Sequence, residues 1–133
     1  MRKFLSGAIT AASIFGLTGA ASAQPAMAPA KQNSCFFVSQ FQSWKAPDDK
    51  TMFIRVGVNK FYRLDMVGSC PALKGISPHL ITTFRGGNSV CSRLDWDLKV
   101  VRSPGGAPEA CIVKEMTALT PEEAAAIPKK FKP

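Results

Sequence analysis

The sequence contains a single histidine, His79, and this scarcity limits the catalytic sites that the chain can form. A Ser/His/Asp or Cys/His site needs an imidazole as its general base, so any such site would have to use His79. No GxSxG segment is present to hold a serine nucleophile. A lone histidine that follows Ser77 and Pro78 is more often a strand-edge or turn residue, so we expect His79 to be structural.

Beyond the N-terminus no apolar run approaches the roughly 18 residues that a membrane-spanning helix needs. The one long uncharged stretch, residues 4–17, follows Arg2 and Lys3 and precedes the small residues Ala21-Ser22-Ala23. A positive start, an apolar centre and a small-residue cleavage site are the three parts of a secretory signal peptide. We therefore predict a signal peptide over residues 1–23, cleavage between Ala23 and Gln24, and a periplasmic or secreted mature chain without a transmembrane segment.

The mature part lacks the Cys-x-x-Cys spacing that lowers the pKa of a redox-active thiol. It holds an even number of cysteines, which in a short exported chain predicts two disulfides. The spacings match no standard zinc site, which disfavours a metal site built from Cys70, His79 and Cys91, and no cofactor motif is present. A thiol redox protein in which Cys70 of GSCPAL cycles is an alternative. The four cysteines are Cys35, Cys70, Cys91 and Cys111.

Four cysteines allow three pairings, and their spacing does not select one. We expect the nested pairing, Cys35 with Cys111 and Cys70 with Cys91, because it would tie the first strand to the last and join neighbouring strand ends. Removing residues 1–23 leaves 110 of the 133 residues. Since a domain of this size is only marginally stable, the two bridges should supply much of its stability.

Apolar residues occupy every second position in two neighbouring segments, residues 52–58 and 62–66. This alternation predicts two half-buried strands that meet as a hairpin around Asn59-Lys60. A register that opposes Arg55 to Asp65 avoids the like-charge pair of Arg55 with Arg63, so we expect it. The residues expected to point inward are Met52, Ile54, Val56, Tyr62, Leu64 and Met66.

Strand-like patterns also cover residues 36–41, 79–84, 94–100 and 111–116, and turn residues separate them. Thr120 before Pro121 and Glu123 has the pattern of a capped helix start, and Pro128 should end that helix. The expected fold is mainly β: a small antiparallel sandwich or partly open barrel of about six strands, with a short C-terminal helix and two disulfides. Residues 24–34 are an expected flexible leader, residues 35–127 the single folded domain, and residues 128–133 a basic tail.

Asp95 and Asp97 flank Trp96 within the predicted strand over residues 94–100. Two carboxylates at i and i+2 on one strand face could clasp a metal or act as an acid/base pair. Lys99 follows on the same face, however, and the alternation predicts simple exposure to solvent. We therefore expect no catalytic or metal-binding residue here, and we keep a small periplasmic enzyme using Asp95, Asp97 or His79 as an alternative.

Basic residues outnumber acidic ones throughout the mature part. Without Arg2 and Lys3, 15 of the 17 Lys and Arg residues remain against 9 Asp and Glu, a net charge of +6. Export makes nucleic acid an unsuitable partner, so an unknown envelope protein or an anionic envelope surface is the expected one. The residues expected to contact an anionic surface are Arg55, Lys60, Arg63, Lys129, Lys130 and Lys132.

Five motifs, four of which carry a cysteine, together resemble a family of exported four-cysteine proteins of Gram-negative bacteria, known as a domain of unknown function. The motifs are CFF at residue 35, VGVNKFYRL, SCPAL, GGNSVCSRLD and CIVKEMTALTPEE. The resemblance spans Cys35 to about Ala126. It implies export and a four-cysteine frame, and it carries no assigned activity. The sequence thus favours an exported, disulfide-stabilised envelope protein that acts as a non-enzymatic binding or structural module.

Overall fold

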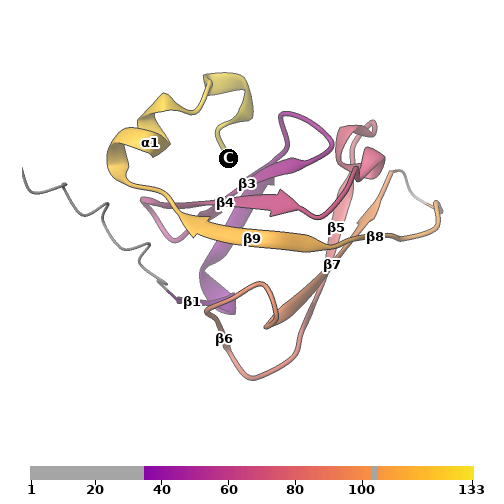
Figure 1. Ribbon diagram of the computed structural model, residues 1–133, viewed down its shortest axis with the longest axis horizontal. Helices are drawn as coiled ribbons and strands as arrows, with labels where there is room; N and C mark the ends of the chain where they lie inside the picture. The colour runs from indigo at the N-terminus through magenta and orange to yellow at the C-terminus, as the bar shows by residue number, and fades with distance from the viewer. Residues whose placement is uncertain (1–34, 103–104) are drawn as a thin grey trace, which may run out of the picture.

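The alternating apolar segments of the sequence form antiparallel strands, as Figure 1 shows for a computed structural model that describes residues 35–102 and 105–133. The expected signal peptide and leader lie outside the described residues. The strands are β1 (Phe36–Phe37), β2 (Phe41–Lys45), β3 (Thr51–Val56), β4 (Lys60–Met66), β5 (His79–Phe84), β6 (Ser89–Val90), β7 (Trp96–Val101), β8 (Glu109–Cys111) and β9 (Val113–Ala118). The α-helix is α1 (Pro121–Ala126), and the 3-10 turns are η1 (Val38–Gln40), η2 (Pro71–Lys74) and η3 (Lys129–Phe131).

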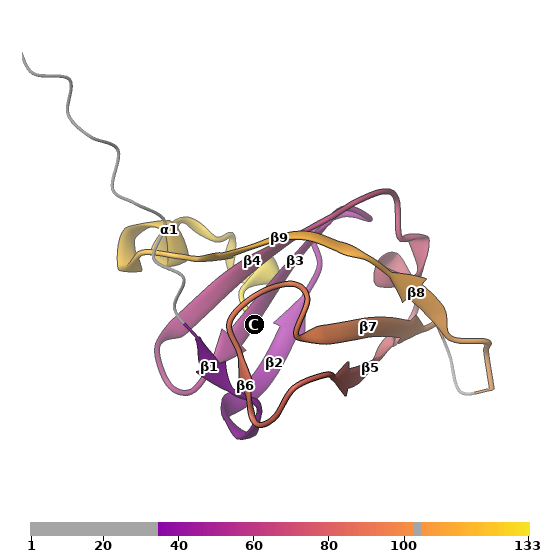
Figure 2. The ribbon, with the colours of Figure 1, turned by 60° about the horizontal axis from the view of Figure 1, so that its bottom comes forward.

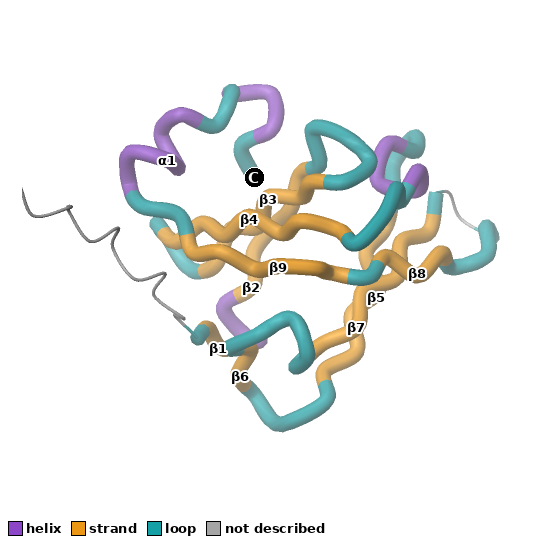
Figure 3. Tube along the Cα trace, viewed as in Figure 1, coloured by secondary structure: helices purple, strands orange, loops and turns teal. Residues whose placement is uncertain are grey.

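The strands form three antiparallel sheets, in the orders β2-β3-β4-β9, β5-β7-β8 and β1-β6. Only Ile112 separates β8 from β9, so the chain passes there from one sheet to another (Figure 3). The segment 111–116, expected as one strand, is therefore divided, with Cys111 in β8. The mainly β class with a short helix and two disulfides is confirmed, and the three sheets do not close into a barrel.

The expected hairpin between β3 and β4 forms, and its apolar set lies on one buried face. Met52 pairs with Leu64 and Ile54 pairs with Tyr62, and these four residues are at most 1% exposed. Burial of one row on each strand is what the period-two alternation predicted.

The register of this hairpin differs from the expected one. Arg55 lies opposite Phe61 and not Asp65. Gly57 has a φ of 58°, a left-handed conformation that glycine adopts at no steric cost, so β3 ends before it. Val58, expected within the strand, lies in the loop and is 84% exposed. The early turn shifts all pairs, but it also keeps the two arginines from opposing each other.

The core lies between the four-stranded sheet and β7. Phe36 of β1 packs between the two, with its ring centroid 5.2 Å from that of Tyr62 and 5.8 Å from that of Trp96. Leu98 and Val100 of β7 are also buried. A two-residue strand thus contributes one of the central aromatic side chains.

The C-terminal segment begins with the expected capped helix. Thr120 Oγ1 accepts a hydrogen bond from the backbone N–H of Glu123 (3.2 Å), and Glu123 Oε2 accepts one from the N–H of Thr120 (2.8 Å). After α1, Lys132 Nζ lies 5.3 Å from the ring centroid of Phe61, whose row on the four-stranded sheet faces away from the core. None of the helices in the described ranges is long and apolar enough to cross a membrane.

The expected nested disulfide pairing is wrong. The bridges join Cys35 to Cys91 and Cys70 to Cys111. Pairing of Phe36 with Val90 in the two-residue strands β1 and β6 brings Cys35 beside Cys91. A hydrogen bond from Val67 N–H to the carbonyl oxygen of Ile112 (2.8 Å) aligns the chain after β4 with the β8–β9 junction, and this brings Cys70 to Cys111.

Candidate functional site

The residues considered for catalysis do not come together. Asp97 on β7 accepts two hydrogen bonds from the guanidinium of Arg85, at 2.8 and 2.6 Å. Asp95 precedes β7 and accepts hydrogen bonds from the backbone N–H groups of Cys91 (2.8 Å) and Ser92 (2.7 Å). These backbone bonds hold the pKa of Asp95 below its ordinary value. Each carboxylate therefore stabilises its own local structure.

His79 lies at the other end of the same strand pair. It starts β5 and pairs with Val101, whereas Asp97 pairs with Thr83 near the end of β5. In the described part of the chain, no group of three or more His, Cys, Asp or Glu residues is placed to hold a metal ion.

Cys70 is buried, at 2% exposure, and its sulfur is bonded to that of Cys111, at 3% exposure. A thiolate nucleophile must be accessible and free. In this structure Cys70 is half of a core bridge.

The basic residues proposed as an anionic contact surface are dispersed. Arg63 donates a hydrogen bond to Asp65 (2.9 Å), and Lys132 lies over Phe61. Arg55 is half-buried on the same outward row of the sheet, and Lys60 is exposed at the start of β4. Among the six, Lys130 lines a pocket.

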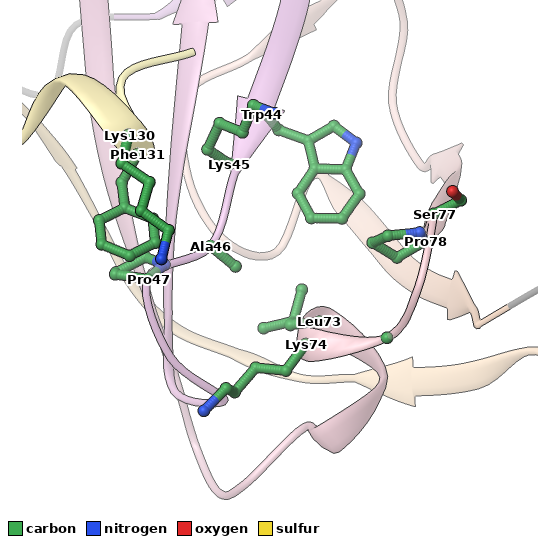
Figure 4. Close-up of a pocket in the computed structure, with 11 residues that line it drawn as sticks. Trp44, Lys45, Ala46, Pro47, Leu73, Lys74, Ser77, Pro78, Lys130 and Phe131 are labelled. Carbon is green, nitrogen blue, oxygen red and sulfur yellow. The ribbon is translucent and has the colours of Figure 1, made fainter.

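That pocket has a volume of about 590 Å³ and is shown in Figure 4. Three separate parts of the chain form it: the end of β2 with the residues that follow, the segment from η2 to the start of β5, and η3. We call it the cationic pocket. Its lining residues are Trp44, Lys45, Ala46, Pro47, Leu73, Lys74, Gly75, Ser77, Pro78, Lys130 and Phe131.

Local backbone features fix the segment from η2 to β5. Gly75 ends η2 against Arg102, where an added Cβ would approach the Arg102 Cβ to 3.2 Å, so a larger residue would crowd this contact. Ser77 has a φ of 50°, in the left-handed region that non-glycine residues rarely adopt. Backbone strain of this kind tends to concentrate at functional sites.

The charge of the pocket lining is entirely positive. Lys45, Lys74 and Lys130 contribute three ammonium groups, no Asp or Glu lines the pocket, and none of the three lysines forms an ion pair within the described residues. Lys130 Nζ lies 5.2 Å from the ring centroid of Phe131. The positive charge at this pocket therefore comes from three separate segments of the chain.

Asp48 and Asp49, which follow the pocket residue Pro47 in the sequence, both accept hydrogen bonds from groups that do not line the pocket. Asp48 Oδ1 accepts hydrogen bonds from the backbone N–H groups of Lys50 (2.8 Å) and Thr51 (2.7 Å). Asp49 accepts a hydrogen bond from the Ser69 hydroxyl, which is the main cause that holds the pKa of Asp49 below its ordinary value. Lys74 is a smaller cause of the same lowering of the Asp49 pKa, and no ion pair joins the two side chains.

Aromatic and apolar side chains form part of the pocket lining, beside a similar area of polar surface. In Figure 4 the Trp44 indole lies on the same side as Leu73 and Pro78, and Phe131 and Lys130 lie across from it beside Pro47. Flat apolar walls with a few charged groups are the usual composition of a small-ligand or side-chain binding site. Sequence reasoning missed Trp44, Lys45 and Lys74, because nothing in the sequence shows that residues near 45, 75 and 130 meet.

Residues 1–131 match the model of a family of unknown function, DUF6491. The chain belongs to this family. No curated protein and no solved structure matches the chain. The resemblance to a domain-of-unknown-function family is therefore confirmed at the level of the family, and the bacterial origin and the export of the chain remain predictions.

Proposed function

We propose that this protein is an exported, non-enzymatic binding module that holds an anionic partner from the cell envelope in the cationic pocket. The observation that carries the proposal is the set of unpaired lysines, Lys45, Lys74 and Lys130, around apolar walls without a lining carboxylate. All three lysines are exposed, and like charges grouped at one site attract an anion more strongly together than each does alone.

Two features support export. The N-terminal segment has the three parts of a signal peptide, and disulfides form and persist mainly in oxidising compartments. A scaffold held by two bridges, with Cys70–Cys111 inside the core, suits a small protein that works outside the cytoplasm.

The contacts of the titratable groups favour binding over catalysis. Asp95 and Asp97 are engaged with backbone N–H groups and with Arg85, respectively, and His79 lies at the far end of the strand pair. An acid/base pair requires its members within reach of one substrate.

The proposal is tested by retention of the protein on an immobilised heparin column, which presents a generic polyanion. Replacing Lys45, Lys74 and Lys130 together by Gln should weaken binding roughly tenfold, as the loss of three contacts of about 0.5 kcal/mol each would. The matched control replaces the exposed lysines Lys50, Lys99 and Lys114, which do not line the pocket, by Gln, so that both variants lose the same net charge. Equal loss of retention by the two variants would refute a specific role for the pocket.

A further inference from the structure

We propose, building on the proposed function, that the partner is an extended acidic segment of another protein, which adds as a strand along the free edge of β5 and places its carboxylates in the cationic pocket. The observation behind this inference is that the edge strands β2 and β5 belong to different sheets and are not joined to each other. We call the region between these two strands the seam. β2 and β5 each have one neighbour, β3 and β7 respectively, and no backbone hydrogen bond joins β2 to β5 in the described residues.

The two ends of the seam are fixed by separate contacts. At one end, before β2 and after β5, the Val38 N–H donates a hydrogen bond to the carbonyl oxygen of Asn88 (2.8 Å). At the other end, Trp44 on β2 and Pro78 before β5 line the same pocket. The two strands therefore run in opposite directions along the seam, and Figure 2 shows the chain continuing after β5 to β6, which lies beside β1.

Apolar side chains along the seam are only partly covered. Leu80 and Phe84 of β5 are half-buried, whereas their partners on β7, Val100 and Trp96, are 0% and 2% exposed. The same difference holds on the other side of the seam. There Phe41 and Trp44 of β2 are half-buried, and their β3 partners Val56 and Ile54 are 0% exposed. A strand placed in the seam would remove this apolar surface from water, which favours binding.

The edge of β5 lacks the features that normally protect an edge strand. Its six residues, HLITTF, include no Lys, Arg, Asp, Glu or Pro, and its pairing with β7 is continuous, without a bulge. Natural sheets usually block such edges with charges, prolines, bulges or very short strands, because unpaired N–H and C=O groups recruit other strands. The opposite edge of the same sheet, β8, is only three residues long. The free β5 edge is thus suited to strand addition, a common mode of peptide recognition.

The charges around the seam indicate which kind of segment would bind there. The seam itself carries no charged side chain on β5, while Lys45, Lys74 and Lys130 surround its end at the start of β5. The sequence of residues 24–34 carries one charge, that of Lys31, which has the wrong sign, and a second copy of this basic chain would be repelled. An acidic partner segment fits both the apolar seam and the cationic pocket.

The direction of the partner segment follows from the position of the lysines together with antiparallel pairing to β5, the more stable of the two arrangements. A strand antiparallel to β5 ends where β5 begins, at the pocket, so the carboxylates belong at its C-terminal end. The expected ligand is an extended segment of alternating apolar and polar residues followed by Asp or Glu.

The test uses a pool of synthetic nonapeptides with Val, Ile or Leu alternating with Thr or Ser, and with Asp-Glu at the C-terminus. We expect the pool to bind the full exported protein, to slow hydrogen exchange of the amides in residues 79–84, and to lose binding to the Lys45→Gln/Lys74→Gln/Lys130→Gln variant. N-methylation of alternate peptide amides removes about three backbone hydrogen bonds, and for at least one of the two alternate sets it should reduce binding roughly tenfold or more. A pool with Asp-Glu moved to the N-terminus is the matched control and should bind more weakly.

Each contrary result has a distinct meaning. If the pool binds through the lysines but neither N-methylated pool is weakened, or exchange in residues 79–84 is unchanged, strand addition is wrong and the cationic pocket stands. If the pool does not bind while heparin retention still depends on the pocket lysines, the partner is not such a segment. If neither the pool nor heparin depends on these lysines, the proposed function itself fails.

Discussion

At the scale of single residues, the disulfide or hydrogen-bond partner of a side chain limits the chemistry that is open to it. Cys70 is 2% exposed and bonded to Cys111, so it presents no free thiol at the surface of this structure. The contacts that Asp95 and Asp97 make could not be predicted from the sequence. Arg85 meets Asp97 only because β5 and β7 pair in one register, and a sequence pattern carries no information on that register.

Replacing Cys70 by Ser should destabilise the protein by about 2 to 5 kcal/mol, because the bridge is lost and Cys111 is left unpaired in the core. Chemical denaturation of the wild-type and variant proteins measures this loss. In the wild-type protein a thiol-alkylating reagent should label no cysteine until the protein is both denatured and reduced. Labelling of Cys70 in the native state, together with a stable Cys70→Ser variant, would instead support a redox role.

At the scale of elements, the strands were easier to predict than their pairing. The alternation in β3 and β4 predicted which face is buried, since burial of one face is a local consequence of period two. It did not predict the register, because a positive φ at Gly57 moved the turn, and Gly57 had been placed within a strand. The two-residue pairing of β1 with β6 gave no local signal, yet it determines which cysteines bond.

The cap of α1 provides a prediction at this scale. α1 has only six residues, too few to be stable alone, and it leads to η3, which delivers Lys130 and Phe131 to the pocket. Replacing Thr120 by Ala should cost about 1 kcal/mol, speed hydrogen exchange across residues 121–133, and weaken heparin retention. Thr120→Ser keeps the hydroxyl acceptor and is the control. Unchanged exchange in Thr120→Ala would mean that packing of Ala124 and Ile127 alone holds the segment.

At the scale of the whole molecule, the alternating strand patterns and the even number of cysteines predicted a mainly β domain with two bridges, because both are read directly along the chain. The cationic pocket could not be predicted in this way. Trp44, Lys74 and Lys130 come from three separate parts of the chain, and they meet only through the order of the sheets and the path of the C-terminal segment. The seam between β2 and β5 could not be predicted either, because the sequence alone does not show which strands lie at the edge of a sheet.

The last prediction concerns the expected export of the protein and the cleavage of its N-terminal segment. Mass spectrometry of the protein recovered from the cell envelope or medium should find Gln24, or its cyclised form, at the N-terminus. A signal peptidase requires small residues at the positions that Ala21 and Ala23 occupy. Replacing Ala23 by Leu should therefore retain residues 1–23, whereas Ala23→Gly should be cleaved normally. The two bridges give an independent check, because a chain that stays in a reducing cytoplasm would keep free thiols. Recovery of a chain beginning at Met1 with four alkylatable cysteines would contradict export, and it would remove the envelope partner from the proposed function while leaving the charge of the pocket unchanged.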